Sequence, residues 1–322
     1  MSFLLHTLLP PLSLLRVALL TSFGIAASFN IANAQLTDIS NRPISSLPTA
    51  DVKANIMLLM DTSASTGWSH MPEAVEGPGT LLPIGYKNPV CNSIYYNRGT
   101  TYQLPKGADG VNLPIPSFTN AAYNYFVNPA VGTNLSTSFR AYDNATRSNQ
   151  DPNAVDAPQA AYYFRYTPPT TGTEVLNYST KPCTQDDTSA VNTGGNFATP
   201  GGGTWTKVIV GTGTGILRPP ASNPSGTATT DERENFAIWY TYYRTRLLLT
   251  KSSLSLAFAP VTDRFRVGFI TANPGTPVAG TKFSELADFT PANKLAWYSK
   301  VFSQVASGSS PMRASLTSTC QG

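Results

Sequence analysis

Three oxygen-bearing side chains, Asp61, Ser63 and Ser65, stand at alternate positions of one short segment. A carboxylate and two hydroxyls spaced in this way can turn toward one point, and the hard cations Mg²⁺ and Ca²⁺ prefer oxygen ligands. The segment directly follows an apolar run, residues 55–60, that is typical of a buried central strand of a parallel sheet. Ligands of such sheets bind beyond the carboxyl ends of the strands, so the spacing predicts a divalent-cation site there. The same residues would also suit a simple turn or helix cap.

Residues for other kinds of chemistry are scarce. The chain of 322 residues has two histidines, His6 and His70, and neither a Gly-x-Ser-x-Gly nor a His-Glu-x-x-His motif. A hydrolytic triad would depend on His70 alone, so we do not expect an enzyme. The net charge is +4 without a basic cluster, which argues against a nucleic-acid partner.

The three cysteines, Cys91, Cys183 and Cys320, bear on the compartment of the protein. In an oxidising compartment a Cys91–Cys183 disulfide is the natural pairing, and it leaves Cys320 over. In the chain-entropy account, closing so long a loop contributes about 4–5 kcal/mol of stability. Two unpaired, buried thiols are the alternative.

The N-terminus has the features of a secretory signal. Arg16 precedes an apolar run from Val17 to about residue 29, and residues 32–34 offer a small-x-small cleavage site before Gln35. The run is shorter than the roughly 20 apolar residues of a membrane span. We therefore expect residues 1–34 to be removed, leaving an exported protein without a membrane span; an N-terminal membrane anchor is the alternative. Charged residues make up only 12% and aromatic residues 11%, which is typical of a loop-rich, β-containing extracellular chain.

A long irregular stretch separates the ordered elements. Residues 67–230 carry repeated turn signals and no helical periodicity, so we interpret them as an insertion with its own β structure. After it, an aromatic stripe at helical spacing predicts a core-packed helix from Asp231 to about residue 258, where Pro260 ends it. The other expected elements are strands over residues 161–166, 205–210 and 265–272, a helix over about residues 292–305, and a helix start at Ser310.

This order of strand, Asp-x-Ser-x-Ser loop, helix, strand, helix and Ser-Pro helix start resembles a von Willebrand factor A (vWA) domain with its metal-ion-dependent adhesion site. The resemblance implies an α/β fold with a Rossmann-like parallel sheet. It also implies that Ser63 and Ser65 bind Mg²⁺ or Ca²⁺ directly, that Asp61 acts mainly through water, and that Ser310 supplies another hydroxyl. In vWA domains a second Asp on a later strand completes the set. The sequence stops before such a strand, so we expect a site and a fold that are incomplete at the C-terminus.

The expected organisation has four parts. They are a signal peptide at 1–34, the start of the vWA domain with the metal loop at 35–66, the insertion at 67–230, and the truncated remainder of the vWA domain at 231–322.

Several motifs extend the resemblance along most of the mature chain. They include a Cys-Asn-x-x-Tyr-Tyr motif at 91–96, a Glu-Arg-Glu-Asn-Phe segment opening the helix at 232, and segments 55–65, 68–73, 265–273 and 309–314. Together they are similar to the N-terminal region of the PilC/PilY family of type IV pilus proteins. The family's C-terminal β-propeller has no counterpart in this sequence.

Membership of this family would imply an exported protein of type IV pilus assembly, at or near the pilus tip, with roles in surface adhesion and twitching motility. Its partners would be pilins or minor pilins and a host or surface receptor. It would lie at the cell surface, on the pilus, or in the outer membrane or periplasm. The alternatives are a secreted vWA-type binding module unrelated to pili, and a truncated fragment without function.

Overall fold

The computed structural model describes residues 52–76, 83–141, 158–178, 182–185, 195–218, 230–275 and 278–309. From Lys53 onward they belong to one structural unit. The expected signal peptide, Ser310 and Cys320 lie outside the described residues. Within these ranges, no helix has the length and apolar character needed to cross a membrane.

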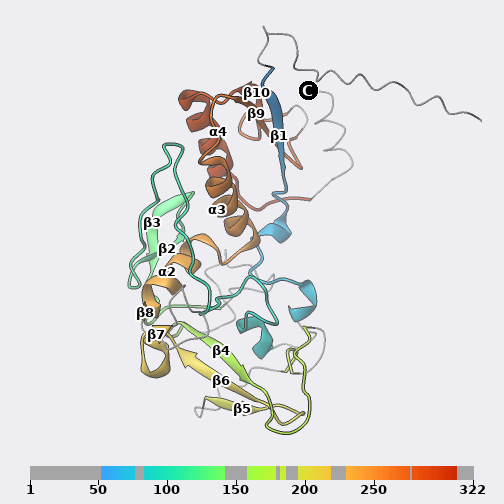
Figure 1. The fold of residues 1–322 in the computed structure, drawn as a ribbon, viewed down its shortest axis with the longest axis vertical. Coiled ribbons are helices and arrows are strands. Elements are labelled where there is room, and N and C mark those ends of the chain that lie inside the picture. The colour runs from blue at the N-terminus through green and yellow to red at the C-terminus, as the bar shows by residue number, and fades with distance from the viewer. Residues whose placement is uncertain are drawn as a thin grey trace, which may run out of the picture. The chain divides into compact units, whose positions relative to one another are not determined.

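The first strand of the described chain belongs to a three-stranded sheet of order β1-β9-β10 (Figure 1). β1 (Ala54–Met60) runs parallel to β9 (Phe265–Thr271), and β10 (Phe283–Asp288) pairs antiparallel with the other edge of β9. No strand in the described ranges pairs with the outer edge of β1. β1 is therefore an edge strand there and is mostly half-buried, whereas the apolar run predicted a buried central strand.

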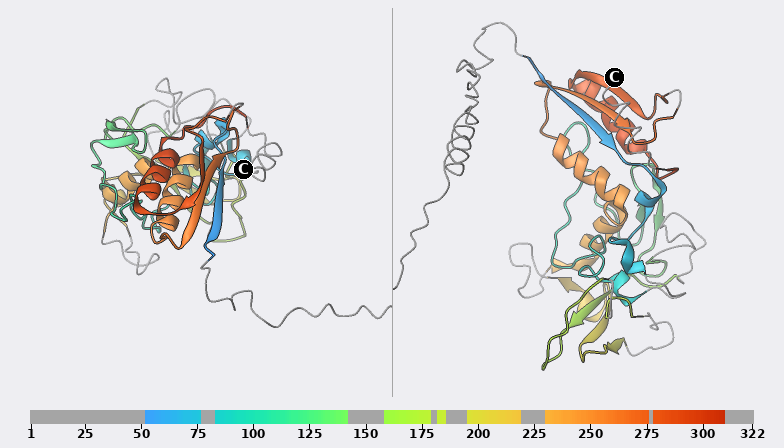
Figure 2. Two further views of the ribbon diagram at one scale, coloured as in Figure 1. Left: turned by 90° about the horizontal axis from the view of Figure 1, so that it is seen from above. Right: turned by 90° about the vertical axis from the view of Figure 1, so that its right-hand side faces the viewer.

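Two helices cover one face of this sheet (Figure 2). They are α3 (Arg246–Phe258) and α4 (Pro291–Ser303). Ile56 on β1 pairs in register with Val267 on β9, so alternate residues of both strands point to the same side and pack against the helices. Trp297 of α4 is buried in this core, and its indole N–H donates to the carbonyl of Gly268 at 3.2 Å.

β10 was not predicted from the sequence. Its segment, Phe-Ser-Glu-Leu-Ala-Asp, lacks a regular alternation of apolar and polar residues. The pairing with β9 shifts register between Ser284 and Ala287, which is the mark of a β-bulge. A bulge breaks the two-residue period on which strand prediction depends.

The helix predicted from Asp231 to about residue 258 is two helices. α2 spans Glu232–Tyr242 and α3 begins at Arg246. Asp231 caps α2, as expected, but Thr245 has an extended backbone and its hydroxyl accepts a backbone N–H of the following turn. This second cap starts a new helix, and the apolar spacing continues across it because both helices bury a stripe.

The region between the metal loop and α2 holds small β elements. A three-stranded antiparallel sheet has the order β4-β6-β5, and two further pairs are β2–β3 and β7–β8. Their bounds are Ala121–Asn124 (β2), Asn128–Thr133 (β3), Tyr162–Thr167 (β4), Asn196–Ala198 (β5), Thr204–Ile209 (β6), Leu217–Arg218 (β7) and Thr230–Asp231 (β8). The strands expected at 161–166 and 205–210 match β4 and β6 to within one residue.

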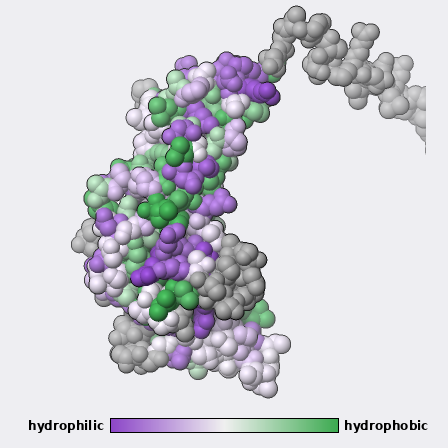
Figure 3. Space-filling view, turned by 60° about the vertical axis from the view of Figure 1, so that its left-hand side comes forward, coloured by the Kyte–Doolittle hydropathy of each residue, from purple (hydrophilic) through white to green (hydrophobic). Residues whose placement is uncertain are grey.

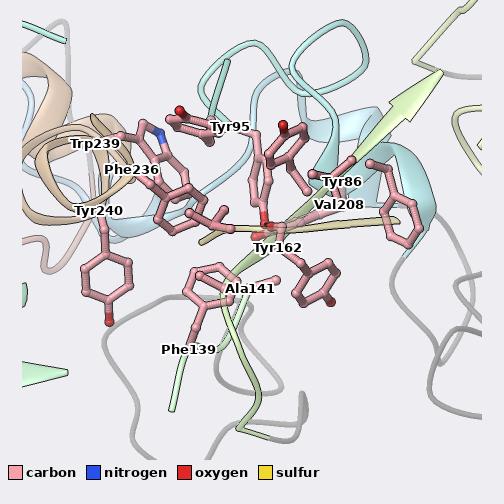
Figure 4. Packing of buried hydrophobic residues seen from close by; sticks show 14 of the residues in the cluster. Tyr86, Tyr95, Phe139, Ala141, Tyr162, Val208, Phe236, Trp239 and Tyr240 are labelled. Carbon is pink, nitrogen blue, oxygen red and sulfur yellow. Dashed lines mark hydrogen bonds between the residues drawn. The ribbon is translucent and has the colours of Figure 1, made fainter. Parts of the chain in front are cut away.

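A largely aromatic core joins this region to α2 (Figure 4). Phe236, Trp239 and Tyr240 of α2 point into it. The Trp239 ring lies 5.0 Å from that of Tyr95, and its N–H donates to the carbonyl of Ile94 at 2.9 Å. Pairing the polar atoms in this way lets large rings be buried without an unmet donor. The aromatic stripe of α2 is core packing, as its spacing predicted.

A disulfide joins Cys91 and Cys183, the pairing expected from the sequence. Both residues are buried, and their Cα atoms lie 5.8 Å apart. The chain at Gly85 passes directly beside the bond, because a Cβ at that position would lie 2.4 Å from the carbonyl oxygen of Cys183. The disulfide therefore ties two remote segments of the aromatic core together.

Hydrophobic and hydrophilic residues are intermixed on the surface. On the face shown in Figure 3, hydrophobic residues lie in several separate groups between hydrophilic ones. That part of the described surface therefore offers no single continuous apolar patch of the kind that marks a large docking site.

Candidate metal centre

The predicted metal loop begins where β1 ends. The N–H of Ala272, just after β9, donates to the carbonyl of Met60 at 2.8 Å, so the parallel ladder extends to the last residue before the loop. Asp61 is exposed and Ser63 is buried. The loop therefore lies at the carboxyl ends of two neighbouring parallel strands, which is where ligands of such sheets bind.

The two serine hydroxyls of the loop lie side by side, with 3.2 Å between Ser63 Oγ and Ser65 Oγ. Two ligands at right angles on one ion would be about 3.0 Å apart for Mg–O bonds of about 2.1 Å, and about 3.4 Å apart for Ca–O bonds of about 2.4 Å. The observed separation falls between these values. The pair therefore suits neighbouring ligand positions on either ion.

Backbone contacts hold the loop in this shape. The Asp61 carboxylate accepts the N–H of Ser63 at 2.8 Å, which turns the carboxylate back over the loop. The hydroxyl of Thr66 donates to the carbonyl of Ser63 at 2.7 Å, at the start of the short 3₁₀ helix η1 (Ala64–Gly67). A carboxylate and two hydroxyls are thus grouped within five residues, and this group is chemically suited to a hard cation.

A second segment, residues 307–308, lies directly beside the loop. The N–H of Ser307 donates to the carbonyl of Thr62 at 2.8 Å, and the N–H of Ala64 donates to the carbonyl of Gly308 at 3.0 Å. Gly308 has a φ of 72°, a left-handed conformation that glycine adopts without strain. Ser310, the remaining predicted ligand, follows two residues later but lies outside the described residues.

Two buried lysines fix the helix that leads into this segment. Lys251 of α3 donates to the carbonyls of Phe302 and Gln304, at 2.7 and 2.5 Å, where α4 ends. In return, Lys294 of α4 donates to the carbonyl of Ala259 at 2.6 Å, where α3 ends. We call this pair the lysine clasp. A cation at each helix C-terminus meets the unpaired carbonyls there, so the clasp sets where the chain leaves α4 toward the loop.

The chain leaving the loop is also anchored. Trp68 and His70 stack with 5.3 Å between ring centroids, and His70 is fully buried. The N–H of Arg246, at the start of α3, donates to the carbonyl of Trp68 at 3.1 Å, and its Nε donates to the carbonyl of His70 at 2.9 Å. The first turn of α3 therefore holds the exit of the metal loop.

The donor set that the structure places together is weakly charged. In the described part of the chain, no three His, Cys, Asp or Glu side chains form a group able to hold a metal ion. A cation at this loop would rely on one carboxylate, the serine hydroxyls and water. Because a site with few charged ligands binds Ca²⁺ weakly, we expect a dissociation constant of roughly 10⁻⁴–10⁻³ M.

Sequence analysis did not identify the backbone of Ser307 and Gly308 as part of this site. Gly308 indicates only a turn, and a turn signal does not say which distant segment the turn contacts. Asn273, which directly follows the strand predicted over residues 265–272, was not predicted to lie at the site either. Its side-chain nitrogen comes within 3.2 Å of where a Cβ on Gly308 would lie, so it borders the same site.

The chain is similar in sequence to the type IV pilus biogenesis factor PilY1 of Pseudomonas aeruginosa. It is 24% identical to PilY1 of strain PAO1 over 311 residues, which cover 92% of this chain and 23% of the relative. Identity to PilY1 of strain UCBPP-PA14 is 23% over 293 residues, and to that of strain PAK 22% over 311 residues.

The chain thus spans less than a quarter of the length of these relatives. No protein-family profile matches it, and no solved structure does. Over about nine-tenths of its length the chain is PilY1-like in sequence.

Proposed function

We propose that this chain is an exported protein of type IV pilus biogenesis whose loop 61–65 holds Mg²⁺ or Ca²⁺. The observation that carries the proposal is the match to PilY1, named for pilus biogenesis, over 92% of this chain. Pilins or minor pilins are the partners that this function implies, at the cell surface, on the pilus, or in the outer membrane or periplasm. Surface adhesion and twitching motility are the processes it would serve.

A vWA-type fold is the architecture that we propose for the metal loop. The parallel pair β1–β9, the antiparallel strand β10 and the two helices on one face support it. The placement of Asp61, Ser63 and Ser65 after the first strand supports it as well. In this arrangement, a cation at the strand ends supplies an open coordination position that a partner's carboxylate can fill. The exposed side of the loop at Asp61 leaves room for such a group.

The pilus role is tested by deleting the gene in its own organism. We expect fewer surface pili in the sheared fraction, and we expect an antibody raised to residues 35–322 to detect the protein in the wild-type pilus fraction. Unchanged piliation in the deletion strain would contradict the pilus role.

The metal role is tested separately by complementing the deletion with Asp61→Asn. Asp109→Asn is a matched control, because the exposed Asp109 also accepts the N–H of the residue two positions on, Val111, at 3.0 Å. We expect Asp61→Asn to lower piliation or adhesion while Asp109→Asn does not. If both variants restore pili and adhesion fully, the pilus role stands and the metal role is wrong.

A further inference from the structure

A buried arginine without a carboxylate partner lies where α2 gives way to α3. Arg244 is 2% exposed. Its Nη1 donates to the carbonyl of Tyr240 at 2.6 Å, and its guanidinium carbon lies 4.1 Å from the ring centre of Tyr123 and 4.3 Å from that of Tyr240. Its Nε has no hydrogen-bond partner in the described part of the chain, and no Asp or Glu there forms an ion pair with it.

This environment leaves the positive charge only partly compensated. Removing a guanidinium from water is costly unless an opposite charge or a full set of hydrogen bonds replaces the water. Contact with the two tyrosine rings recovers part of that cost. This contact does not satisfy the Nε–H donor of Arg244. The two rings lie over the guanidinium carbon and accept no hydrogen bond from Nε.

The same arginine lines a small cavity. The space in it that water-sized particles can reach is about 10 Å³, and the other lining residues are Tyr123, Asn124, Thr245, Leu247 and Leu248. A space of this size admits about one small particle, and cavities that stay empty in proteins are apolar. This one is polar, so we expect it to be occupied.

Two further residues that line the cavity have hydrogen-bonding groups without a partner in the described part of the chain. The N–H of Leu248 donates to the Thr245 hydroxyl at 3.2 Å. The N–H of Leu247 makes no hydrogen bond within the described residues. It belongs to the first turn of a 13-residue helix, where the helix dipole favours an anion. The Oδ1 atom of Asn124 is buried without a partner, and a half-turn of the amide would put its NH₂ donor there instead.

We propose that this cavity binds a halide ion, chloride in ordinary media, held by Arg244, the Asn124 amide and the first turn of α3. A single-atom anion supplies the missing negative charge in the least space. A water molecule would fill the space but leave the charge unmet. Sulfate, phosphate or a carboxylate needs room for several heavy atoms, whereas water-sized particles can reach only about 10 Å³ here.

The first test uses the unaltered protein. Melting temperature is measured at constant ionic strength while sodium gluconate is replaced by sodium chloride or sodium bromide. A ligand that binds only the folded state raises the melting temperature with its concentration. We expect a saturating rise with both halides, and an anomalous-diffraction peak in the cavity of a bromide-soaked crystal. A melting temperature that does not respond to halide, or a cavity without bromide, would overturn the proposal.

The second test supplies the missing charge within the chain. Asn124→Asp places a carboxylate in the same cavity as Arg244, so it should replace the anion: the halide response is lost, and the protein in gluconate melts no lower than the wild type does. Asn128→Asp is the matched control, because Asn128 faces Asn124 in the same hairpin and is exposed. It should keep the halide response. An Asn124→Asp variant that still responds to halide would rule out this cavity as the site.

Discussion

Glu174 shows how much structure one side chain organises in this protein. Its carboxylate accepts hydrogen bonds from the hydroxyls of Tyr166 and Thr199, and from the N–H groups of Gly201 and Gly203 at 2.9 and 3.1 Å. The glycines allow the close approach, since a Cβ on Gly201 would lie 2.6 Å from the carboxyl carbon. Desolvation raises the pKa of Glu174, but the four donors outweigh it and leave the pKa below its usual value.

We predict that Glu174→Gln destabilises the protein by about 1–3 kcal/mol at neutral pH, because an amide replaces a charged acceptor that collects four donors. The lowered pKa means that this contribution is present above the ordinary carboxyl pKa of about 4.5 and is lost as the pH falls through the folded-state pKa. Urea unfolding at pH 7 and pH 4 would measure it, with the exposed Glu285→Gln as control. Equal loss of stability in both variants at pH 7 would contradict this role.

The metal-loop residues are the part of the site that the sequence could predict. Asp61, Ser63 and Ser65 lie within five residues, so their alternation after an apolar run is visible without a structure. The contacts of Ser307 and Gly308 were not predictable, because they join the loop across more than 240 residues through backbone atoms. Backbone contacts of this kind carry no side-chain signature.

At the scale of elements, the lysine clasp determines how α3 and α4 pack. Lys251 and Lys294 each lie against the end of the opposite helix, and burial lowers the pKa of both ammonium groups. For Lys251 the pKa falls to about 7, from an ordinary value near 10.5. A charged lysine so placed costs free energy that a neutral amine does not.

This lowered pKa predicts that stability rises with pH. Between about pH 7 and pH 10.5 the unfolded chain holds a proton on Lys251 that the folded chain has largely lost, so the free energy of unfolding increases with pH. For one proton the slope is at most about 1.4 kcal/mol per pH unit. Between about pH 7.5 and pH 9.5, inside that window, we expect the free energy of unfolding to rise more steeply with pH in the wild type than in Lys251→Met.

Lys300→Met is the control for this comparison, since Lys300 is likewise a helix lysine that donates to a backbone carbonyl, that of Phe283 at 2.6 Å. Chemical unfolding of the three proteins at several pH values gives the slopes. Parallel curves for the wild type and Lys251→Met would show that the clasp lysine stays charged when folded.

Long elements with regular periods were predictable, and interrupted ones were not. The positions of β4, β6, β9 and α4 follow from their apolar spacing to within a residue or two. The division between α2 and α3 was missed because Thr245 interrupts the backbone without interrupting the stripe. Two-residue strands such as β7 and β8 have no period to detect.

At the scale of the whole molecule, the disulfide is a covalent constraint on the aromatic core. It links positions 92 residues apart and closes a region rich in turns. We predict that replacing Cys91 and Cys183 together by Ala lowers the free energy of unfolding by about 4–5 kcal/mol, because the unfolded chain gains the freedom that the bond removes. Urea unfolding under non-reducing conditions measures the loss. Cys320→Ala serves as the control, and a double variant as stable as this control would contradict the prediction.

The most direct test of the central claim is calorimetric titration of the purified protein with MgCl₂ and CaCl₂. The account predicts one site, with a dissociation constant of roughly 10⁻⁴–10⁻³ M for the tighter ion, and loss of binding when Ser63 and Ser65 are both changed to Ala. A matched control changes Ser117 and Thr119 to Ala, since their exposed hydroxyls lie 3.1 Å apart at the same sequence spacing. Binding that persists without Ser63 and Ser65, or no binding by the wild type at millimolar metal, would contradict a cation site at this loop.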